Sequence, residues 1–447
     1  MKASCGKESN EMRKQTLFDQ SLSLYEQVYA EDHLRDAFRE VKRNGGSPGI
    51  DGVTIEMFES KLDRELGLLQ QEVKNWTYGP MPVRRVEIPK PSGGVRILGV
   101  PTIRDRVLQA SLRGILEPIL DPTFSPNSYG FRPGRNQEQA VKAAQAIVQS
   151  GKEYVVDIDL SKFFDRIHHD RLIHRLGTLV SDKRILRLVG TILRSGVMID
   201  GIFEATTEGA TQGSPLSPLL SNLVLDELDK ELERRGLEFC RFADDCNIFV
   251  GSQKSADRVM ITASKFIENR LKLVVNREKS KVAKSSAVKF LGMTIVAGAI
   301  AISAASLSRA MDKVRELTPR GTQHTIEASV KTINNWYVGW SNYYKMTEYP
   351  AQLKGIEAHI RRRLRSRFVS QQKNRRVLFN RLRKRGVSRK QAAKTAFSND
   401  RRWVLSHKNA VEKAYSNKWF IKTLGLKIAS DKQFPHWRPV TEWIKLT

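Results

Sequence analysis

Four aspartates in two short stretches have the residue types and the spacing to do chemistry. Asp157 and Asp159 alternate with apolar residues, so a strand would carry both carboxylates on one face. Asp244 and Asp245 lie between two apolar, β-prone runs, which predicts a hairpin with both carboxylates at its tip. Carboxylates in an apolar strand are costly unless they are paired or bind a cation. Together the two stretches would supply the oxygen ligands that Mg²⁺ prefers.

A solvated turn is the alternative interpretation of Asp244 and Asp245, because aspartate is common in turns. Two histidines, His168 and His169, follow the first stretch closely. We do not expect them to bind the metal, since Mg²⁺ favours oxygen ligands, and we place them in a solvated loop.

The positive charge of the chain is large and unevenly distributed. Its 447 residues carry a formal net charge of +28 with a pI near 10.1, which indicates a polyanionic partner. From Gly355 onward, 25 Lys and Arg stand against 5 Asp and Glu, a net of +20. A basic module is therefore attached to a more nearly balanced one, and the length allows two to four domains.

No feature of the sequence indicates secretion or a membrane span. The first 14 residues are charged but lack the apolar core of a signal peptide, and no apolar run reaches 18 residues. The cysteines, Cys5, Cys240 and Cys246, have neither zinc-site nor disulfide spacing. We expect a soluble protein of a reducing cytoplasm, with no membrane partner.

The elements that must position the aspartates follow from the spacing of apolar residues. Helical spacing occurs over 17–43, as one broken helix or two, and over 54–75, with a glycine- and proline-rich loop between them. A hairpin is predicted over 83–100, with Lys90 and Arg96 on either side of its glycine turn. These two charges are suited to a triphosphate, or are simply solvated. Three further helices are predicted over 307–317, 325–344 and 353–368.

The order of the motifs resembles the palm of a reverse transcriptase. Asp159 is followed five residues later by Phe164, then by Gly209-Ala210-Thr211-Gln212-Gly213-Ser214-Pro215, then by Phe242-Ala243-Asp244-Asp245. Within that class the chain most closely resembles the group II intron reverse transcriptase and maturase family, over nearly its whole length. One departure is Phe242, where the family more often has tyrosine; the ring is kept, so activity is expected to survive.

The resemblance implies an α+β fold of the right-hand polymerase type. Its fingers and palm would combine an antiparallel sheet with helices, followed by a helical thumb and a small, helical, basic C-terminal domain. The implied domains are an N-terminal extension with the start of the fingers (1–82), fingers and palm (83–302), a maturase-specific thumb (303–375) and a DNA-binding domain (376–447).

The same resemblance implies roles for individual residues. Asp159, Asp244 and Asp245 would be the catalytic ligands of two Mg²⁺ ions, for which Mn²⁺ can substitute, with Asp157 a bystander. The implied nucleotide-binding residues are Lys90 and Arg96 on the triphosphate, Phe164 under the sugar, Gln212 at the templating pair and Lys279 near the leaving pyrophosphate. For Phe164 the alternative is a core position beside Phe163.

The basic runs of the last third are implied to contact nucleic acid. The residues concerned are Arg361, Arg362, Arg363, Arg365, Arg381, Arg383, Lys384 and Arg385. The implied partners are group II intron RNA, target DNA, the template-primer duplex and dNTPs. No Cys and His pairs follow Cys246, so we expect no endonuclease domain, as in the class C lineage.

The function that the resemblance implies is RNA-directed DNA synthesis coupled to intron biology. The chain would bind its intron RNA, assist splicing and copy the intron into DNA during retrohoming. Two alternatives remain open: a splicing-only maturase with an inactive palm, and a domesticated bacterial reverse transcriptase in defence or repair. Intact Asp159, Asp244 and Asp245 favour an enzyme over the splicing-only alternative.

Overall fold

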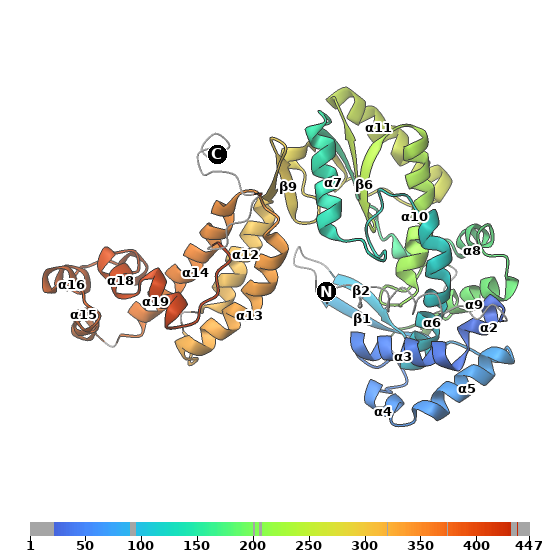
Figure 1. Cartoon of the computed structure of the whole chain (residues 1–447), viewed down its shortest axis with the longest axis horizontal. Helices are drawn as coiled ribbons and strands as arrows, with labels where there is room; N and C mark the ends of the chain where they lie inside the picture. The colour runs from blue at the N-terminus through green and yellow to red at the C-terminus, as the bar shows by residue number, and fades with distance from the viewer. Residues whose placement is uncertain are drawn as a thin grey trace, which may run out of the picture. The chain divides into compact units, whose positions relative to one another are not determined.

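The computed structural model describes residues 22–89, 95–199, 202–204, 208–319, 321–372, 374–430 and 436 (Figure 1). The chain forms two compact units, one of residues 1–147 and 151–283 and one of residues 148–150 and 284–447. The predicted palm and thumb boundary after residue 302 therefore falls inside the second unit, and the division into four domains stays a prediction.

In the first unit, each of the two predicted helical stretches forms two helices separated by a short break. The first helical stretch forms α2 (Leu24–Val28) and α3 (Glu31–Asn44), and the second forms α4 (Ile55–Glu59) and α5 (Leu62–Lys74). Helix α3 ends at Gly45, whose φ of 65° suits a residue without a Cβ. The predicted glycine- and proline-rich loop begins there.

A four-stranded sheet of order β2-β1-β4-β5 carries the predicted hairpin. Strands β1 (Val83–Pro89) and β2 (Val95–Val100) pair antiparallel, which confirms the hairpin. Lys90, which was predicted beside the glycine turn of this hairpin, falls outside the described residues. Strand β1 also pairs in parallel with β4 (Val197–Ile199), so this sheet is mixed, and β5 (Ile202–Glu204) completes it.

A second four-stranded sheet, of order β6-β7-β3-β8, carries the aspartates. Strand β7 (Asp245–Val250) pairs antiparallel with β6 (Glu238–Phe242) on one side and with β3 (Tyr154–Ile158) on the other. Strand β8 (Lys281–Lys284) is the fourth. Because β7 lies between β3 and β6, both acidic stretches meet at one end of the sheet.

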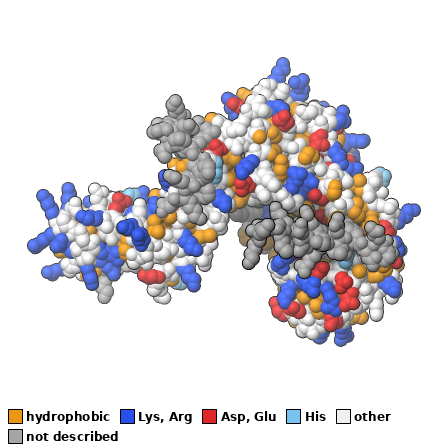
Figure 2. Space-filling model, viewed as in Figure 1, with side chains coloured by type: hydrophobic (Ala, Val, Ile, Leu, Met, Phe, Trp, Pro, Cys, Tyr) orange, Lys and Arg blue, Asp and Glu red, His pale blue; other side chains and the backbone are white. Residues whose placement is uncertain are grey.

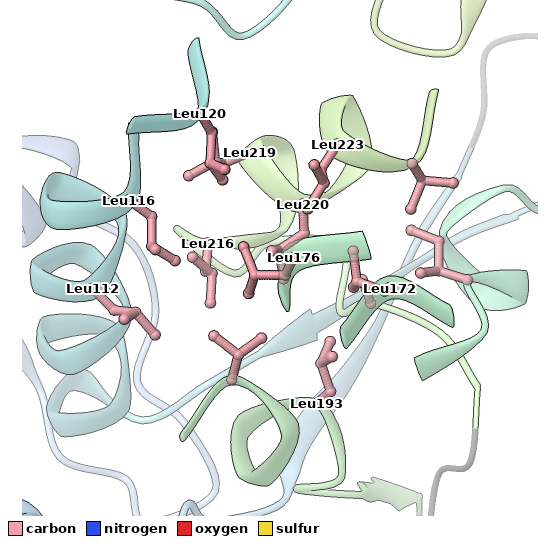
Figure 3. Close-up of a cluster of buried hydrophobic side chains, with 14 of the residues drawn as sticks. Leu112, Leu116, Leu120, Leu172, Leu176, Leu193, Leu216, Leu219, Leu220 and Leu223 are labelled. Atoms are coloured by element: carbon pink, nitrogen blue, oxygen red, sulfur yellow. The ribbon is translucent and has the colours of Figure 1, made fainter. Parts of the chain in front are cut away.

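Leucine-rich helices form a large part of the core of the first unit (Figure 3). They are α6 (Ile103–Leu120), α8 (His169–Gly177), α9 (Lys183–Leu193) and α10 (Ser217–Arg234). The leucines of α6 recur every four residues, so one helical face is buried throughout. The cluster contains Leu112, Leu116, Leu120, Leu172, Leu176, Leu193, Leu216, Leu219, Leu220 and Leu223.

Among its described residues, the second unit consists mainly of helices and has a hairpin of β9 (Met293–Val296) and β10 (Ala299–Ile302). The three predicted long helices are confirmed as α12 (Ala304–Leu317), α13 (Ile326–Tyr344) and α14 (Pro350–Ser370). Five shorter helices follow: α15 (Arg375–Lys384), α16 (Arg389–Ala396), α17 (Arg402–Leu405), α18 (Asn409–Ala414) and α19 (Asn417–Lys422). Within the described ranges, none of the helices combines the length and apolar character needed to cross a bilayer.

One continuous hydrophobic core runs through this unit from Ala310 to Leu426. It joins side chains of the three long helices to those of α15, α16, α18 and α19. The predicted thumb and DNA-binding regions therefore share one hydrophobic core.

Candidate active site

The β6–β7 hairpin places Asp244 at its tip. Phe242 pairs with Asp245, which leaves Ala243 and Asp244 as a two-residue turn. Ala243 has φ of 57°, as the tight turns of such hairpins require. The prediction that both carboxylates lie at the tip was wrong for Asp245, which is the first residue of β7, because pairing with Phe242 draws it into the sheet.

Asp159 lies at the same end of the sheet, directly after β3. Its backbone N–H donates to Ser280 Oγ (3.0 Å), and its carbonyl accepts from the N–H of Asn276 (2.8 Å). The last β3 pair is Ile158 with Cys246, so Asp159 follows on the strand beside Asp245. The turn at residues 276–280 thus fixes the backbone of the predicted catalytic aspartate.

Asp244 and Asp159 interact electrostatically. Asp244 is exposed at the surface, yet the protein around it removes part of its hydration. This desolvation, and then the negative charge of Asp159, raise the pKa of the Asp244 carboxyl, while Arg96 and Arg241 oppose the shift. A cation bound here would offset the repulsion that Asp159 exerts on the Asp244 carboxylate.

The donor chemistry of this pair suits Mg²⁺. Among the residues the structure describes, no three His, Cys, Asp or Glu side chains form a group that could hold a metal ion. Proteins commonly hold Mg²⁺ through one or two carboxylates, and waters and substrate phosphates complete its coordination. Asp159 and Asp244 can supply these carboxylates. Asp245 accepts a hydrogen bond from Asn247 Nδ2 (3.3 Å), and its part in metal binding stays a prediction.

A pocket of about 460 Å³ adjoins Asp244. Three of the predicted nucleotide-binding residues, Arg96, Phe164 and Gln212, also line it. Phe163 is buried in the core, whereas Phe164 is half-buried and packs against it edge to face at 5.2 Å between ring centroids. Of the two rings, Phe164 is therefore the one that meets the pocket.

Two glycines bring the Gln212 segment against β2. The N–H of Gly99 donates to the carbonyl of Gln212 (2.9 Å). A Cβ on Gly99 would lie 2.3 Å from Thr211 Cγ2, and Gly213 has φ of 115°. This close approach sets Gln212 beside the strand that carries Arg96.

Two arginines of α6 also line the pocket, and sequence reasoning missed them. Arg113 is paired with Glu40 of α3. Arg106 is buried and donates to the carbonyls of Pro101 (3.0 Å) and Ser47, and desolvation lowers its pKa. Their seven-residue spacing, which puts both on one helical face, is the signal that could have found them.

Lys279 is exposed in the turn at residues 276–280. Its backbone N–H donates to Asn276 Oδ1 (3.3 Å), and Asn276 in turn contacts the backbone of Asp159. The lysine thus belongs to the segment behind the aspartate, and its contact with pyrophosphate stays a prediction.

The histidine pair departs from expectation. His168 is exposed, but His169 begins α8 and is buried, so the prediction of a solvated loop was wrong for His169. His169 Nε2 donates to the carbonyl of Gly209 (2.6 Å), and burial lowers its pKa. The N–H of Ala210 donates to the carbonyl of Phe164 (2.7 Å). His169 therefore helps to join the Phe164 segment to the loop that leads to Gln212.

Most arginines of α14 that were predicted to contact nucleic acid bind other groups of the protein. Arg365 is buried and donates to the carbonyl of Tyr415 and to Asn417 Oδ1, both at 3.0 Å. Arg363 donates to Thr318 Oγ1 (2.9 Å). The remaining two are half-buried: Arg361 lies near Glu357, and the Arg362 guanidinium lies 4.2 Å from the Trp403 ring centroid.

Helix α15 presents its basic residues to solvent. Arg381, Arg383 and Lys384 are exposed, whereas Arg385 is half-buried over the ring of Trp419, 4.3 Å from its centroid. Figure 2 shows many Lys and Arg side chains over the region of α15, α16 and α18. The exposed residues remain candidates for contact with nucleic acid.

The two sheets, the pocket and the helical second unit have the organisation of a right-hand polymerase. The family model "Reverse transcriptase (RNA-dependent DNA polymerase)" matches residues 88–295. A second model, "Group II intron, maturase-specific domain", matches residues 307–386. The chain belongs to the group II intron reverse transcriptase and maturase family.

Individual relatives agree with these matches. Protein YkfC of Escherichia coli is 32% identical over 53% of this chain and 72% of its own length. Group II intron-encoded protein LtrA of Lactococcus lactis is 31% identical over 58% of this chain and 42% of LtrA. The putative COX1/OXI3 intron 1 protein of Saccharomyces cerevisiae is 34% identical over 50% and 26%. The aligned part is thus less than half the length of the two intron-encoded relatives.

Proposed function

We propose that the chain is an RNA-directed DNA polymerase that also acts as a maturase for a group II intron RNA. The observation that carries the polymerase proposal is the turn residue Asp244, which interacts with Asp159 and lines the same pocket as Arg96, Phe164 and Gln212. The maturase proposal is supported by the match of residues 307–386 to the maturase-specific model.

In this proposal Asp159 and Asp244 hold Mg²⁺, with Asp245 as the adjacent third carboxylate. Bound Mg²⁺, two ions in the proposed mechanism and replaceable by Mn²⁺, would activate the primer 3′ hydroxyl and stabilise the leaving pyrophosphate. The fixed backbone of Asp159 and the tight turn at Asp244 keep the two carboxylates in place, so little reorganisation is needed when substrate binds.

The pocket residues would bind and select the dNTP. Arg96 and Lys90 would neutralise the triphosphate, and Lys279 the pyrophosphate. Phe164 would lie under the sugar and exclude a ribose 2′ hydroxyl, while Gln212 would contact the templating pair. The two glycine contacts between β2 and the Gln212 segment support this arrangement, because they bring triphosphate- and template-side residues together.

The basic second unit would hold intron RNA, target DNA and the template-primer duplex. Support comes from the exposed α15 residues and from a pocket of about 650 Å³ lined by Arg361, Arg362 and Arg365 together with two histidines. Contacts with phosphates position a duplex without reading its sequence, which suits a copying enzyme. Acting on DNA, the protein would work at the bacterial nucleoid.

A primer-extension assay tests the polymerase proposal. The purified chain should extend a DNA primer on an RNA template with dNTPs and Mg²⁺, more weakly or comparably with Mn²⁺, and not in EDTA. Asp159→Ala should abolish extension, while its affinity for the RNA, measured by filter binding, should remain. A wild-type chain that binds RNA but never extends the primer would favour the splicing-only alternative.

The same variant separates the maturase activity from copying. Asp159→Ala should still promote splicing of a flanking intron RNA, because the second unit is unchanged. Failure of both the wild type and this variant to promote splicing of the RNA that flanks the reading frame would favour the domesticated reverse transcriptase.

A further inference from the structure

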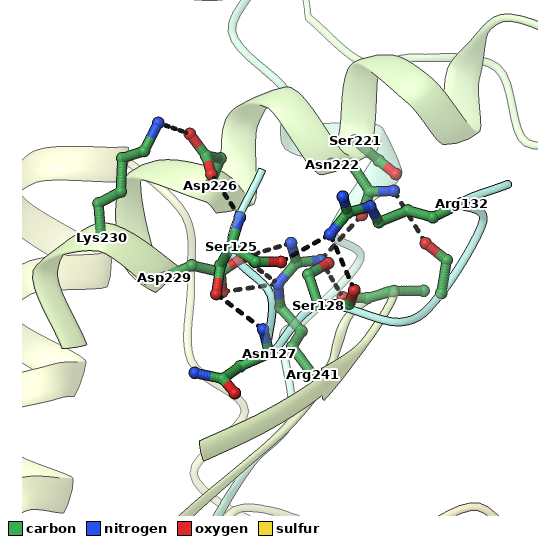
Figure 4. A network of polar contacts seen from close by, with 12 residues as sticks. Ser125, Asn127, Ser128, Arg132, Ser221, Asn222, Asp226, Asp229, Lys230 and Arg241 are labelled. Carbon is green, nitrogen blue, oxygen red and sulfur yellow. Dashed lines mark hydrogen bonds and ion pairs between the residues drawn. The ribbon is translucent and has the colours of Figure 1, made fainter. Parts of the chain in front are cut away.

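Arg241 of β6 is a fully buried cation two residues before the turn alanine (Figure 4). Its Nε donates to both carboxylate oxygens of Asp229 on α10 (2.8 and 3.0 Å), and Nη2 donates to one of them (2.5 Å). Its Nη1 donates to Asn222 Oδ1 and to the carbonyl of Ala243, both at 2.9 Å. The guanidinium thus connects helix α10 to the turn that carries Asp244.

Fold stability alone is a poor explanation for this arrangement. Both side chains of the Arg241–Asp229 pair have no exposed surface, and burying two charges is costly even when they pair well. Apolar residues of similar volume commonly serve as well or better in such a position. What apolar residues cannot provide is the donor to the Ala243 carbonyl.

Gly130 makes a second contact with the turn. A Cβ on Gly130 would lie 2.3 Å from the backbone nitrogen of Ala243, so only glycine permits this contact. Asn222 Nδ2 donates to the carbonyl of Gly130 (2.9 Å), while its oxygen accepts from Arg241. Asn222 therefore links the two supports of the turn.

The backbone of Arg241 completes the connection. Its N–H donates to the carbonyl of Asn127, and its carbonyl accepts from the N–H of Tyr129, both at 2.9 Å. The segment before Gly130 is thereby attached to β6 beside the turn. Ala243, a non-glycine residue at positive φ, is thus contacted at its nitrogen by Gly130 and at its carbonyl by Arg241.

We propose that Arg241, Asp229 and Asn222 form a positioning network that fixes the Ala243 turn and so directs the Asp244 carboxylate toward Asp159. Arg241 is a positioning residue and does not touch the substrate. The inference rests on the proposed polymerase function, in which Asp244 holds Mg²⁺. A displaced turn would weaken metal binding and slow the chemical step, while dNTP binding through Arg96 would continue.

Arg241→Lys tests the network, because it keeps a cation near Asp229 but cannot donate to Asp229, Asn222 and Ala243 together. We expect kcat for primer extension to fall about tenfold or more, since small displacements of catalytic groups are costly. The Mg²⁺ concentration for half-maximal activity should rise, and the KM for dNTP should change little. Mn²⁺ binding can also be measured without catalysis, by titration followed by electron paramagnetic resonance. The Arg241→Lys variant should bind Mn²⁺ more weakly than the wild type.

Arg367→Lys is the matched control. Arg367 of α14 is also buried, and it donates to Ser329 Oγ and to the carbonyl of His324, all within the second unit. The substitution should lower thermal stability while leaving the metal dependence unchanged. The same Mg²⁺ and Mn²⁺ dependence in the Arg241 and Arg367 variants would overturn the proposal.

Asn222→Ala covers the case in which Arg241→Lys does not fold, because it keeps the buried Arg241–Asp229 pair. It removes the acceptor of Arg241 Nη1 and the donor to the carbonyl of Gly130. It should weaken Mn²⁺ binding in the same direction, and unchanged Mn²⁺ binding would contradict the network. If the wild type does not extend the primer, the polymerase proposal fails. The Mn²⁺ titration of the variants would still test whether the network positions the Ala243 turn.

Discussion

Phe164, six residues after the end of β3, lines the pocket beside Asp244, and Phe163 packs against it in the core. Phe164→Ala removes the ring proposed to exclude a ribose 2′ hydroxyl. We expect the efficiency of rNTP use relative to dNTP use to rise roughly 10- to 100-fold, the range typical of a pocket defined by shape. Single-nucleotide incorporation with matched rNTP and dNTP measures this ratio.

Phe163→Leu is the comparison for that prediction. It should lower the melting temperature, because it removes buried ring atoms, and leave the sugar preference unchanged. A change in sugar preference for Phe163→Leu but not for Phe164→Ala would show that the two rings had been assigned the wrong way round.

His169 should make stability depend on pH. Burial lowers its pKa in the folded chain, so the folded and unfolded states are both neutral above the ordinary histidine pKa of about 6.5. As the pH falls below that value, the unfolded chain takes up a proton and the folded chain resists it, which favours unfolding. We expect the melting temperature of the wild type to fall between pH 7 and 5 more steeply than that of His169→Gln.

His174 provides the control on the same helix, since it is exposed. His174→Gln should follow the wild type across this pH range. If His169→Gln and the wild type lose stability in parallel, the buried imidazole is not the cause.

Residue types were the most predictable part of the site, and their exact geometry the least. Local motifs named Asp244, Arg96, Phe164 and Gln212, which line one pocket in the structure, and Asp159 beside it. Their roles in catalysis stay predictions. The place of Asp245 in the sheet could not be found from a local motif, because it depends on the register of β6 with β7. The burial of His169 likewise depends on the distant Gly209.

Strand β2 packs closely against the segment that contains Gln212, at Gly99. Gly99→Ala would bring a Cβ to 2.3 Å from Thr211 Cγ2 and 3.1 Å from Val83 Cγ2. We expect it to destabilise the fold by about 1–3 kcal/mol, as overpacking does, and to raise the KM for dNTP. Chemical denaturation and steady-state extension measure the two effects.

Gly114→Ala is the matched substitution, because a Cβ on this exposed α6 glycine would meet nothing within 4 Å. It should stabilise the helix by about 0.5–1 kcal/mol and leave the KM unchanged. The account of the β2 contact fails if Gly99→Ala matches Gly114→Ala in both measurements.

Whole elements were predictable wherever apolar residues recur with a clear period. The hairpin of β1 and β2 and the helices α12, α13 and α14 all formed as expected. The parallel pairing of β1 with β4 could not be foreseen, because nothing local in β1 specifies a partner so far along the chain. The same holds for Arg241, whose importance depends on contacts with α10.

At the scale of the molecule, the basic charge is concentrated in the second unit, and its predicted thumb and DNA-binding regions share one core. Deleting the last helices would therefore disturb α14, so charge removal is the sounder test. Replacing Arg381, Arg383 and Lys384 by Gln should reduce the slope of log affinity for single-stranded RNA against log salt by about 2, if each contacts one phosphate.

The control removes three exposed lysines from the first unit. These are Lys254 and Lys265 of α11 (Gln253–Phe266) and the nearby Lys272. Their replacement by Gln alters the net charge equally and should leave most of the salt slope. Identical slopes for the two triple variants would show that overall charge, and not the α15 surface, sets the affinity.

The most direct test of the central claim compares two aspartates of the same sheet in Mg²⁺-dependent extension of a DNA primer on an RNA template. Asp244→Ala removes the turn carboxylate that interacts with Asp159, whereas Asp157→Ala removes one beside Asn247, within the strand. We predict that Asp244→Ala abolishes primer extension while the affinity for RNA stays largely intact. Asp157→Ala should retain most of the extension activity. Undiminished synthesis by Asp244→Ala would contradict the assignment of the active site.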